Sequence, residues 1–364
     1  MIDTSPLRVA LLIYGSIDTV SGGYLYNRQL VRYLRSRGDS VEIISLPYRG
    51  YWRHLGDNVS RALRRRLAAL DVDILIQDEM NHPSLAWLNG WVPRRFPIVS
   101  LVHLLKVTER HSWGVRPIFH PIEHRYLRSV DGYIVTSQTT ATEIETRFNL
   151  HKPTVIAVPA GDRFQPQNNP SANRTPDTPL QLLYVGNVIR RKGLHVVLEA
   201  MVEATETELI VIGPTDVEAA YTKELVAFIG RNALQSRVHF IGALDHQPLV
   251  EQYQMADVFV MPAYYESFGI VYLEAMGFGL PTIGTTGGAA HELITHGENG
   301  FLIAPDDAQS LAKYLKTLHN HPTLRQQMRD RALARFAAHP SWNNSMATVR
   351  DFLLAMQLDW ETSR

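Results

Sequence analysis

Short apolar runs alternate with segments of helical periodicity along the first half of the chain. The first run covers residues 9–14, a helical pattern follows over 27–37, and residues 41–44 form the next run. Further runs of the same kind lie at residues 73–76, 97–101, 132–135 and 154–158. Apolar runs separated by helical segments are typical of βα units, so we expect a doubly wound, mainly parallel sheet.

This pattern is interrupted once and then repeats. Residues 165–179, QPQNNPSANRTPDTP, show no periodicity and are rich in Pro, Asn and Thr, which predicts a linker. Beyond it we expect strands at residues 182–185, 208–212, 238–241 and 258–261, and helices at 194–204, 219–231, 249–255 and 342–358. The chain is therefore divided into a first α/β domain (1–164), the linker (165–179), a second α/β domain (180–340) and a terminal helix (341–364).

Residues 258–294 carry the most specific functional pattern. An apolar run ends at Pro262, which cannot extend a central strand, so the polar residues after it form a loop at a strand's carboxyl end. A helix is expected to begin near Ser267, and its first turn would present unpaired N–H groups to an anion. Glu266 and Glu274 frame this anion site. The arrangement favours a phosphate flanked by two groups that carry hydroxyls.

Composition excludes several kinds of chemistry. The 364 residues include no cysteine, so disulfides, thiolate nucleophiles and cysteine metal sites are excluded. The 36 basic and 36 acidic residues balance, but residues 1–165 carry 21 basic and 15 acidic residues and the remainder carries 15 and 21. The opening MIDTSPLRVALLIYGS lacks a basic leader with a cleavable apolar core, and no apolar run reaches spanning length. We expect a soluble, cytoplasmic protein, with peripheral contact to the inner face of the membrane as an open alternative.

The stretch 258–294 resembles the retaining glycosyltransferases of family 4, a group that includes glycogen synthases and phosphatidylinositol mannosyltransferases. The family hallmark is a Glu-x7-Glu pair followed by a Gly-Gly-x-x-Glu turn. Here the pair is Glu266 and Glu274, and the turn is GGAAHE at residues 287–292, one residue longer than the commonest form. The resemblance implies the GT-B fold: two Rossmann-like, doubly wound domains facing across a cleft, with a C-terminal helix that crosses back to the first domain.

The same resemblance implies the reaction. A hexosyl group would pass from a nucleotide-diphosphate sugar, with UDP- and GDP-sugars as the favoured donors, to an acceptor hydroxyl with retention of the anomeric configuration. Same-face attack, in which the leaving phosphate accepts the acceptor's proton, would require neither a metal nor another cofactor. Nothing in the sequence indicates a nucleic-acid partner, and it does not indicate the acceptor or the oligomeric state.

The resemblance also implies roles for individual residues. Glu274 would hold the ribose hydroxyls, Glu266 the hydroxyls of the sugar, and main-chain amides after Glu266 the diphosphate. The implied donor-binding set is Gly22, Gly23, Asn187, Arg190, Arg191, Lys192, Gly213, Gly242, Glu266, Ser267, Phe268, Gly269, Ile270 and Glu274, and the implied catalytic set is His103, Arg191, Lys192 and Glu266.

The basic loop of this set departs from the family pattern. Residues 186–193, GNVIRRKG, resemble the family's Gly-Arg-x4-Lys-Gly segment, whose basic residues neutralise the departing diphosphate. Lys192 matches, but Asn187 replaces the usual arginine. Whether Arg190 or Arg191 supplies the missing charge stays open at this point.

Two further features carry both a functional and a structural interpretation. His103 follows the strand at 97–101, where the family places a histidine beside the transferred sugar, although a histidine at a strand end is more often structural. Gly22 and Gly23 precede a helix, where backbone amides could approach a phosphate, and an ordinary tight turn explains them equally well. Residues 158–164, VPAGDRF, resemble the family's Pro-Asn-Gly-Val-Asp segment and mark a hinge.

A basic stretch at residues 49–66 contains most of the positive excess of the first half, with Arg49, Arg53, Arg61, Arg64, Arg65 and Arg66. As an amphipathic helix it could lie on anionic lipid or hold an anionic acceptor. A surface helix whose apolar face joins the core is the alternative. We expect this region to face the acceptor, with Tyr51, Trp52, Arg53, Lys106 and Glu109 as the candidate acceptor-binding residues.

Three competing interpretations were weighed. Residues 120–124, HPIEH, match the H-x-x-E-H pattern of some zinc proteases, but no third ligand is identifiable, and proline suits only the first turn of a helix. A nucleotide-sugar 2-epimerase of GT-B fold would need carboxylates placed for elimination rather than the pair Glu266 and Glu274. A non-catalytic sugar-nucleotide binding protein would not need the basic loop that ends in Lys192.

Overall fold

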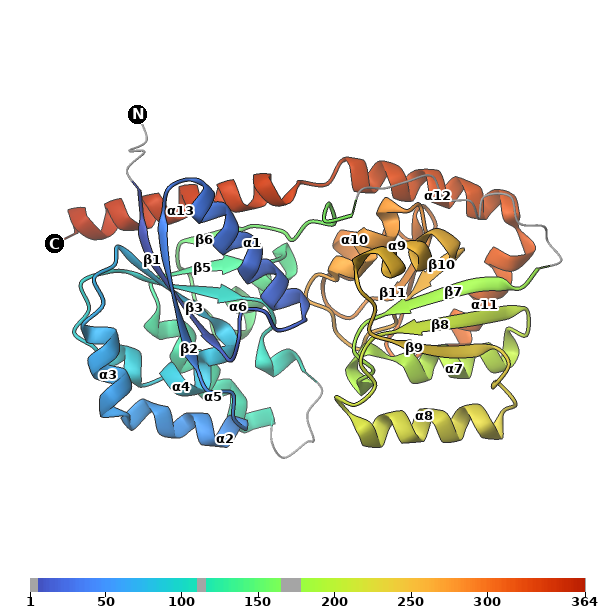
Figure 1. The fold of residues 1–364 in the computed structure, drawn as a ribbon, viewed down its shortest axis with the longest axis horizontal. Coiled ribbons are helices and arrows are strands. Elements are labelled where there is room, and N and C mark those ends of the chain that lie inside the picture. Colours follow the sequence, from blue (N-terminus) through green and yellow to red (C-terminus); the bar gives the residue numbers. More distant parts are fainter. Residues whose placement is uncertain (1–5, 110–115, 165–177, 364) are drawn as a thin grey trace. The chain divides into compact units, whose positions relative to one another are not determined.

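The computed structural model describes residues 6–109, 116–164 and 178–363, so most of the expected linker at 165–179 lies outside the described residues. The chain forms two compact units, Met1–Pro159 with Pro340–Arg364, and Ala160–His339. The first unit thus ends after Pro159, where the sequence analysis places a limit after residue 164. Each unit contains its own sheet with helices on both faces, and together they are the two Rossmann-like domains of a GT-B fold (Figure 1).

The sheet of the first unit is parallel in its described part, with strand order β2-β1-β3-β4-β5-β6. Its strands are β1 (Arg8–Tyr14), β2 (Ser40–Leu46), β3 (Ile74–Asp78), β4 (Ile98–Val102), β5 (Gly132–Val135) and β6 (Thr154–Ile156). Its helices are α1 (Gly22–Ser36), α2 (Tyr51–His54), α3 (Arg61–Ala68), α4 (His82–Leu85), α5 (Arg116–Ser129), α6 (Gln138–Phe148) and α13 (Trp342–Thr362).

Burial explains why these segments are strands. Every residue of β3, β4 and β5 is buried, as expected for strands covered on both faces, whereas the edge strands β2 and β6 have exposed residues. Apolar side chains of α3, α5 and α6 join one core on one face of the sheet. On the other face α1 packs against α13 (Figure 1).

The second unit repeats this plan with strand order β12-β11-β10-β7-β8-β9, again parallel. Its strands are β7 (Leu180–Val185), β8 (Thr207–Ile212), β9 (Val238–Gly242), β10 (Val258–Val260), β11 (Thr282–Thr285) and β12 (Gly300–Ile303). Its helices are α7 (Leu194–Glu203), α8 (Ala219–Arg231), α9 (His246–Met255), α10 (Ile270–Gly277), α11 (Ala308–Asn320) and α12 (Pro322–Ala337).

The start of α10 corrects one expectation. The helix begins at Ile270 rather than near Ser267, because Gly269 adopts a left-handed conformation with φ of +85° immediately before it. A Cβ at Gly269 would lie 2.3 Å from the ring of Tyr272, so only glycine fits there. Ser267 and Phe268 therefore belong to the loop that follows β10.

The terminal helix α13 is tied to the first unit by a buried ion pair. Arg350 donates to both carboxylate oxygens of Asp39, with distances of 2.8 and 2.9 Å. Asp39 also accepts from the backbone N–H of Leu7 at 2.9 Å, and its side chain is fully buried. Because Asp39 lies between α1 and β2, this pair anchors residues 340–364 to the start of the sheet.

We expect Arg350→Ala to lower the free energy of unfolding of the first unit by about 3 kcal/mol, because it leaves the buried Asp39 carboxylate without its cation. The tryptophans among the described residues (Trp52, Trp87, Trp91, Trp342 and Trp360) all belong to this unit, so tryptophan fluorescence in a urea titration follows its unfolding. Arg147→Ala is the control, since it removes an ion pair on the surface of α6 and should cost less than about 1 kcal/mol. Equal small losses in both variants would contradict the anchoring role.

Candidate functional site

The carboxylate of Glu266 lies in the loop between β10 and α10, beside two cations. It forms an ion pair with the ammonium of Lys192, and Nη1 of Arg191 lies 3.7 Å from Oε2. The side chains of Glu266, Lys192 and Arg191 are 11%, 16% and 23% exposed, respectively. The structure therefore brings together three of the four predicted catalytic residues in a largely buried cluster, which we call the Glu266 cluster.

Charge and burial oppose each other in the Glu266 cluster. Burial acts to raise the pKa of Glu266, but attraction to Lys192 and Arg191 outweighs it, and the pKa lies below its ordinary value. Burial lowers the pKa of Lys192, and Glu266 works in the opposite direction. With all three groups ionised, two positive charges face one negative charge.

Glycines hold the backbone of Glu266 in place. The backbone N–H of Glu266 donates to the carbonyl of Gly287 at 3.0 Å, and its carbonyl accepts from the N–H of Ala289 at 2.7 Å. A Cβ on Gly288 would lie 2.2 Å from the carbonyl oxygen of Glu266, and one on Gly287 would lie 2.1 Å from that of Tyr264. The Gly-Gly pair of the family hallmark is thus required by the close approach of two backbones.

The two arginines of the basic loop point to different partners. Arg191 donates to the carbonyl of Tyr265 at 2.8 Å and faces Glu266. Arg190 forms an ion pair with Glu224 of α8, and its guanidinium lies 4.8 Å from the ring centre of Tyr221. Arg191, and not Arg190, is therefore the arginine of this loop that faces Glu266.

Glu274 is fully buried in α10 and is bound by an arginine that the sequence analysis did not assign to the site. Arg163 donates to both of its carboxylate oxygens, at 2.9 Å for the Nη2 to Oε2 contact. The hydroxyl of Tyr253 donates to Oε2 at 3.1 Å. The signal for Arg163 was available, because it lies in the segment 158–164 that was interpreted only as a hinge marker.

The remaining donor residues gather where the strands of the second sheet end. Gly213 follows β8, and a Cβ there would lie 2.1 Å from the carbonyl oxygen of Gly186, which follows β7. The backbone N–H of Gly213 donates to the carbonyl of Gly242 at 2.9 Å. Asn187 follows in the same loop and is partly exposed. Loops at the carboxyl ends of parallel strands are the usual ligand-binding position of this architecture.

In the first unit, His103 lies close to the start of α1. Its ring is 3.2 Å from the position that a Cβ on Gly23 would take, so glycine permits this approach. Nε2 of His103 lies 3.1 Å from Oδ1 of Asn27, whose amide nitrogen donates to Asp78 at 2.8 Å. Because Oδ1 of Asn27 can only accept, the hydrogen of the His103 ring is assigned to Nε2. Burial lowers the pKa of His103, and the nearby Asp78 carboxylate acts in the opposite direction. Gly22 is the first residue of α1, and Ser21 caps the helix.

Three of the five candidate acceptor residues lie around Phe119 of α5. The Phe119 ring is 4.7 Å from that of Tyr51, 5.8 Å from that of Trp52, and 5.7 Å from the ammonium of Lys106. Lys106 is ion-paired with Glu109. Arg53 is exposed on α2. Tyr51 is also tied inward, because its hydroxyl lies 3.0 Å from Nε2 of His82.

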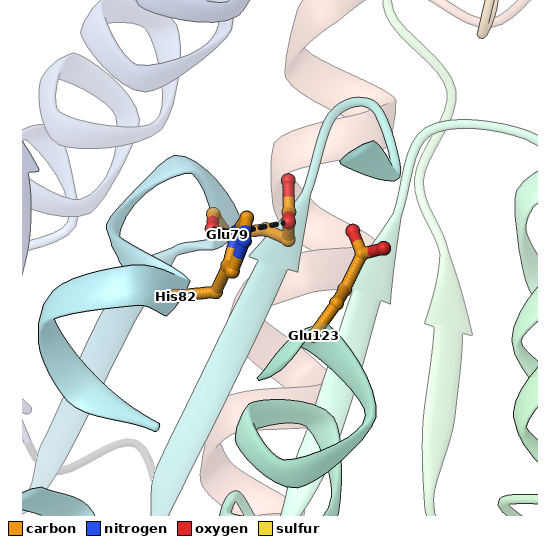
Figure 2. Close-up of side chains that lie close together, drawn as sticks. All are labelled: Glu79, His82 and Glu123. Atoms are coloured by element: carbon orange, nitrogen blue, oxygen red, sulfur yellow. Dashed lines mark hydrogen bonds and ion pairs between the residues drawn. The ribbon is translucent and has the colours of Figure 1, made fainter. Parts of the chain in front are cut away.

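The H-x-x-E-H pattern at residues 120–124 does not assemble a zinc site. The rings of His120 and His124 stack on Phe148, whereas the Glu123 carboxylate turns inward toward Glu79 and His82 (Figure 2). Pro121 lies inside α5, which begins at Arg116, so the expectation that proline is confined to the first turn is wrong for this helix. The polar residues Asp78 and Glu79, at the end of β3, were missed, although polar residues after a buried strand are a recognisable signal.

Two family descriptions match consecutive parts of the chain. "Glycosyltransferase Family 4" matches residues 20–161, and "Glycosyl transferases group 1" matches residues 166–335. Among characterised relatives, a D-inositol 3-phosphate glycosyltransferase of Corynebacterium urealyticum is 29% identical over 94% of this chain and 91% of its own length. A glycogen synthase of Mycobacterium tuberculosis is 27% identical over 75% of this chain, and the match spans 66% of the synthase.

Solved structures show the same fold at low sequence identity. A sucrose-phosphate synthase of Thermosynechococcus elongatus has a TM-score of 0.82 at 23% identity, covering 94% of this chain and 97% of that one. HepE of Anabaena, solved in complex with UDP and glucose, has a TM-score of 0.72 at 19% identity, covering 94% and 98%.

Gly288→Ala should lower the free energy of unfolding of the second unit by more than about 2 kcal/mol, because the residue has φ of +86° and its new Cβ would meet the carbonyl of Glu266. Circular dichroism during urea unfolding measures this loss. Gly230→Ala in α8 is the control, since the nearest atom to its Cβ lies 3.9 Å away, and it should be neutral or slightly stabilising. A neutral Gly288→Ala would show that the turn has room to relax.

Proposed function

The chain belongs to glycosyltransferase family 4, and from that premise we propose that it transfers a hexose from a nucleotide-diphosphate sugar, UDP- or GDP-linked, to an acceptor hydroxyl with retained configuration. The Glu266 cluster is the observation that carries this proposal. Two cations and one carboxylate leave a net positive charge in a mostly buried position at the carboxyl ends of β7 and β10. Buried charge of this kind fits an anionic ligand such as a diphosphate.

Each member of the Glu266 cluster has a proposed role. Lys192 and Arg191 compensate the negative charge that grows on the diphosphate as it leaves. Glu266, which is ionised because its pKa is lowered, accepts hydrogen bonds from sugar hydroxyls. The backbone N–H groups of Phe268, Gly269 and Ile270 add dipoles at the start of α10. Because fixed cations supply the electrostatic stabilisation, we propose that the reaction proceeds without a metal ion.

Glu274 is proposed to bind the ribose hydroxyls. Its carboxylate has about four acceptor positions, and Arg163 and Tyr253 use three of them, leaving one on Oε1. Because the carboxylate is fully buried while Arg163 is 33% exposed, a ribose can reach Oε1 only if the Arg163 side chain shifts. Nucleotide binding should therefore be accompanied by movement of Arg163.

In the first unit, Gly22, Gly23 and His103 are proposed to serve the diphosphate and the transferred sugar, as the family resemblance implies. With its hydrogen on Nε2 and its pKa lowered, His103 is neutral near pH 7 and has a lone pair on Nδ1. The acceptor is proposed to approach Tyr51, Trp52 and Lys106. Same-face attack would then pass the acceptor's proton to the departing phosphate.

The complex of HepE with UDP and glucose agrees with a nucleotide-sugar donor for this fold. The inositol phosphate and glycogen enzymes among the relatives differ in their acceptors. A thermal-shift screen over nucleoside diphosphates and their sugars identifies the donor, because a ligand of the native state raises stability.

With the donor identified, Lys192→Met should reduce turnover by roughly 10²–10³, since a preorganised cation that faces the developing charge is removed. Arg191→Ala should reduce turnover more than Arg190→Ala, because Arg191 faces Glu266 and Arg190 is engaged by Glu224. Release of nucleoside diphosphate measures turnover, and circular dichroism verifies folding. Lys313→Met, on the exposed side of α11, is the control for loss of a positive charge.

Three outcomes of this assay would contradict the proposal. Turnover near the wild-type level in Lys192→Met would show that Lys192 does not compensate the charge of the leaving diphosphate. Release of no nucleoside diphosphate by the wild-type protein would indicate a binding protein. Scrambling of the donor sugar without any acceptor would indicate a 2-epimerase.

The cytoplasmic location and a peripheral contact with anionic membrane through residues 49–66 remain proposals. In the described parts of the chain, no helix combines the length and apolar character needed to cross a bilayer. Leu63 and Leu67 of α3 are buried in the core, so the apolar face of this helix is already used, while Arg61, Arg64 and Arg65 are exposed. Contact with lipid through α3 would therefore be electrostatic rather than by insertion.

In a flotation experiment the protein should rise with vesicles that contain acidic phospholipid and not with neutral vesicles. Changing Arg61, Arg64 and Arg65 together to alanine should weaken this binding by about 1 kcal/mol per arginine. Changing Lys223, Lys313 and Lys316, exposed on the second unit, to alanine is the matched control. Equal recovery of the wild-type protein with both kinds of vesicle would rule out the membrane contact.

A further inference from the structure

Three ionisable side chains meet in the interior of the first unit. Glu79 follows β3, His82 begins α4 and Glu123 lies on α5, and the side-chain atoms through which they could bind an ion all lie within 4.8 Å of one another (Figure 2). Glu79 and His82 are 2% exposed, and Glu123 is fully buried. We call these residues the buried triad; the mechanism proposed above does not use them.

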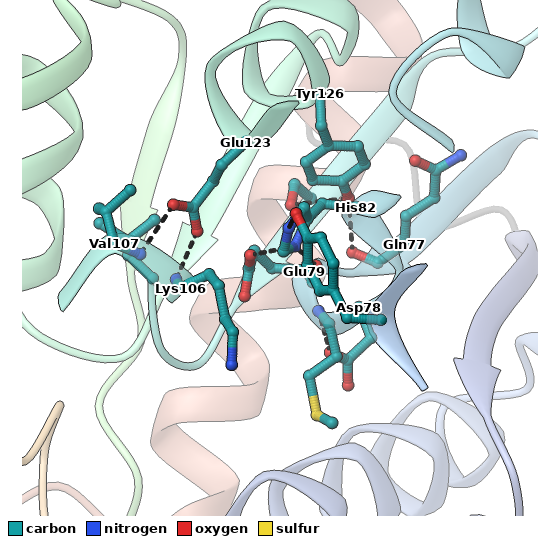
Figure 3. Close-up of polar contacts among 12 residues, drawn as sticks. Gln77, Asp78, Glu79, His82, Lys106, Val107, Glu123 and Tyr126 are labelled. Carbon is teal, nitrogen blue, oxygen red and sulfur yellow. Dashed lines mark hydrogen bonds and ion pairs between the residues drawn. The ribbon is translucent and has the colours of Figure 1, made fainter. Parts of the chain in front are cut away.

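The hydrogen bonds of Glu123 show what it holds. Its Oε1 accepts from the backbone N–H of Lys106 at 2.5 Å, and its Oε2 accepts from that of Val107 at 3.0 Å (Figure 3). These two amides begin the short 3-10 helix Lys106–Thr108, three residues after His103. Glu123 therefore fixes the turn between His103 and the candidate acceptor residues Lys106 and Glu109.

Burial lowers the pKa of His82, so its ring is neutral near pH 7. Its Nδ1 lies 3.1 Å from the carbonyl oxygen of Glu79, which can only accept, so Nδ1 carries the hydrogen. Its Nε2 lies 3.0 Å from the hydroxyl of Tyr51 and accepts from it. Nδ1 is also 2.8 Å from Oε1 of Glu79, yet this oxygen has no well-directed hydrogen bond. His82 therefore does not neutralise the Glu79 carboxylate.

A metal ion fits these residues poorly. Both oxygens of Glu123 already accept amide hydrogens, and both ring nitrogens of His82 have protein partners. A bound proton can compensate the two carboxylates instead of a metal. It removes one of the two negative charges from the buried site and leaves the hydrogen bonds of Glu123 and His82 in place.

We propose that Glu79 and Glu123 share one proton in the folded protein, and that with His82 they act as positioning residues for the turn Lys106–Thr108 beside His103. The inference rests on the burial and contacts of the first unit and does not depend on the donor or the acceptor. Glu79 also follows Asp78, whose carboxylate accepts from Asn27 and lies 3.7 Å from Nε2 of His103, so one turn after β3 serves both the triad and His103.

The charges that surround the pair favour a bound proton. Burial raises the pKa of both carboxyl groups, that of Glu79 to about 8. Asp78 and Glu109 act in the same direction on Glu79, and Lys106 acts against them. Among the described residues, Tyr51, His82 and Tyr126 also face the two carboxyl groups, and none of these three carries a positive charge near pH 7. Because the two carboxyls interact, the raised values belong to the pair as a whole.

The sign of the pH dependence follows from the raised pKa. A carboxyl with a pKa of 4.5 when unfolded and about 8 when folded contributes stability below pH 4.5 and loses it as the pH rises toward 8. Between these limits the folded state holds one proton more than the unfolded state. The unfolding equilibrium constant of the first unit should then rise by about tenfold per pH unit from this pair alone.

Glu79→Gln keeps the shape of the side chain and removes the proton. Unfolding in urea is followed by tryptophan fluorescence. The ratio of the unfolding constant of Glu79→Gln to that of the wild-type protein should fall by about tenfold per pH unit between pH 5.5 and 7.5. Glu145→Gln, on the exposed side of α6, should show no such change. An infrared band of a protonated carboxyl should be present in the wild-type protein at pH 7 and lost or weakened in Glu79→Gln.

Hydrogen exchange at Lys106 and Val107 tests the positioning role. The exchange of these two amides should accelerate in the wild-type protein as the pH rises through about 8, beyond the general increase of exchange seen at the amides of α6. If Glu79→Gln fails to fold, the infrared and exchange measurements on the wild-type protein still decide the matter. Three results would each overturn the proposal. They are the absence of the protonated carboxyl band, a parallel pH dependence of wild type and Glu79→Gln, and a stoichiometric metal ion that is lost with Glu79→Gln.

Discussion

A carboxylate withdrawn from water has to be compensated, and in the second unit this requirement organises the loops around Glu266. Two cations from the loop after β7 reach it, and the loops interlock, because the backbone N–H of Tyr264 donates to the carbonyl of Arg191 at 2.8 Å. The glycines at 287 and 288 let a third loop bond to the backbone of Glu266 from both sides. The desolvation cost of these charges is thus met during folding, so the dipoles and cations are already oriented for the anionic donor that we propose.

The first unit meets the same requirement in a different way. Asp78, Glu79 and Glu123 lie at or near the carboxyl ends of the strands, where amides, neutral histidines and a bound proton surround them, and the nearby Lys106 is ion-paired with Glu109. The physical consequence is a difference in pH response. Permanent cations hold Glu266 ionised across neutral pH, whereas a shared proton makes the turn after His103 sensitive to alkaline pH.

The success of the sequence analysis varied with the kind of signal. Most of the parallel strands are continuous apolar runs, so the predicted runs correspond to β1–β10, and α8 was predicted at its observed limits. The predictions do not include β12, which has only four residues, or α11, although Asp307 caps that helix by accepting from Ser310. The predicted start of α10 was wrong because Gly269 adopts a left-handed conformation immediately before Ile270, where a Cβ would meet the ring of Tyr272.

The sequence by itself determined the α/β fold class through apolar periodicity, and the resemblance of residues 186–193 and 258–294 to family 4 singled out Lys192, Glu266 and Glu274. Tertiary structure decided which groups meet. Lys192 and Glu266 are 74 residues apart, and Arg163 and Glu274 are 111 apart. That Arg190 points away from Glu266 depends on Glu224 and Tyr221 of another helix. Local sequence does not fix the direction of a long side chain in a turn, because that direction is set by the charges and rings that other elements bring to it.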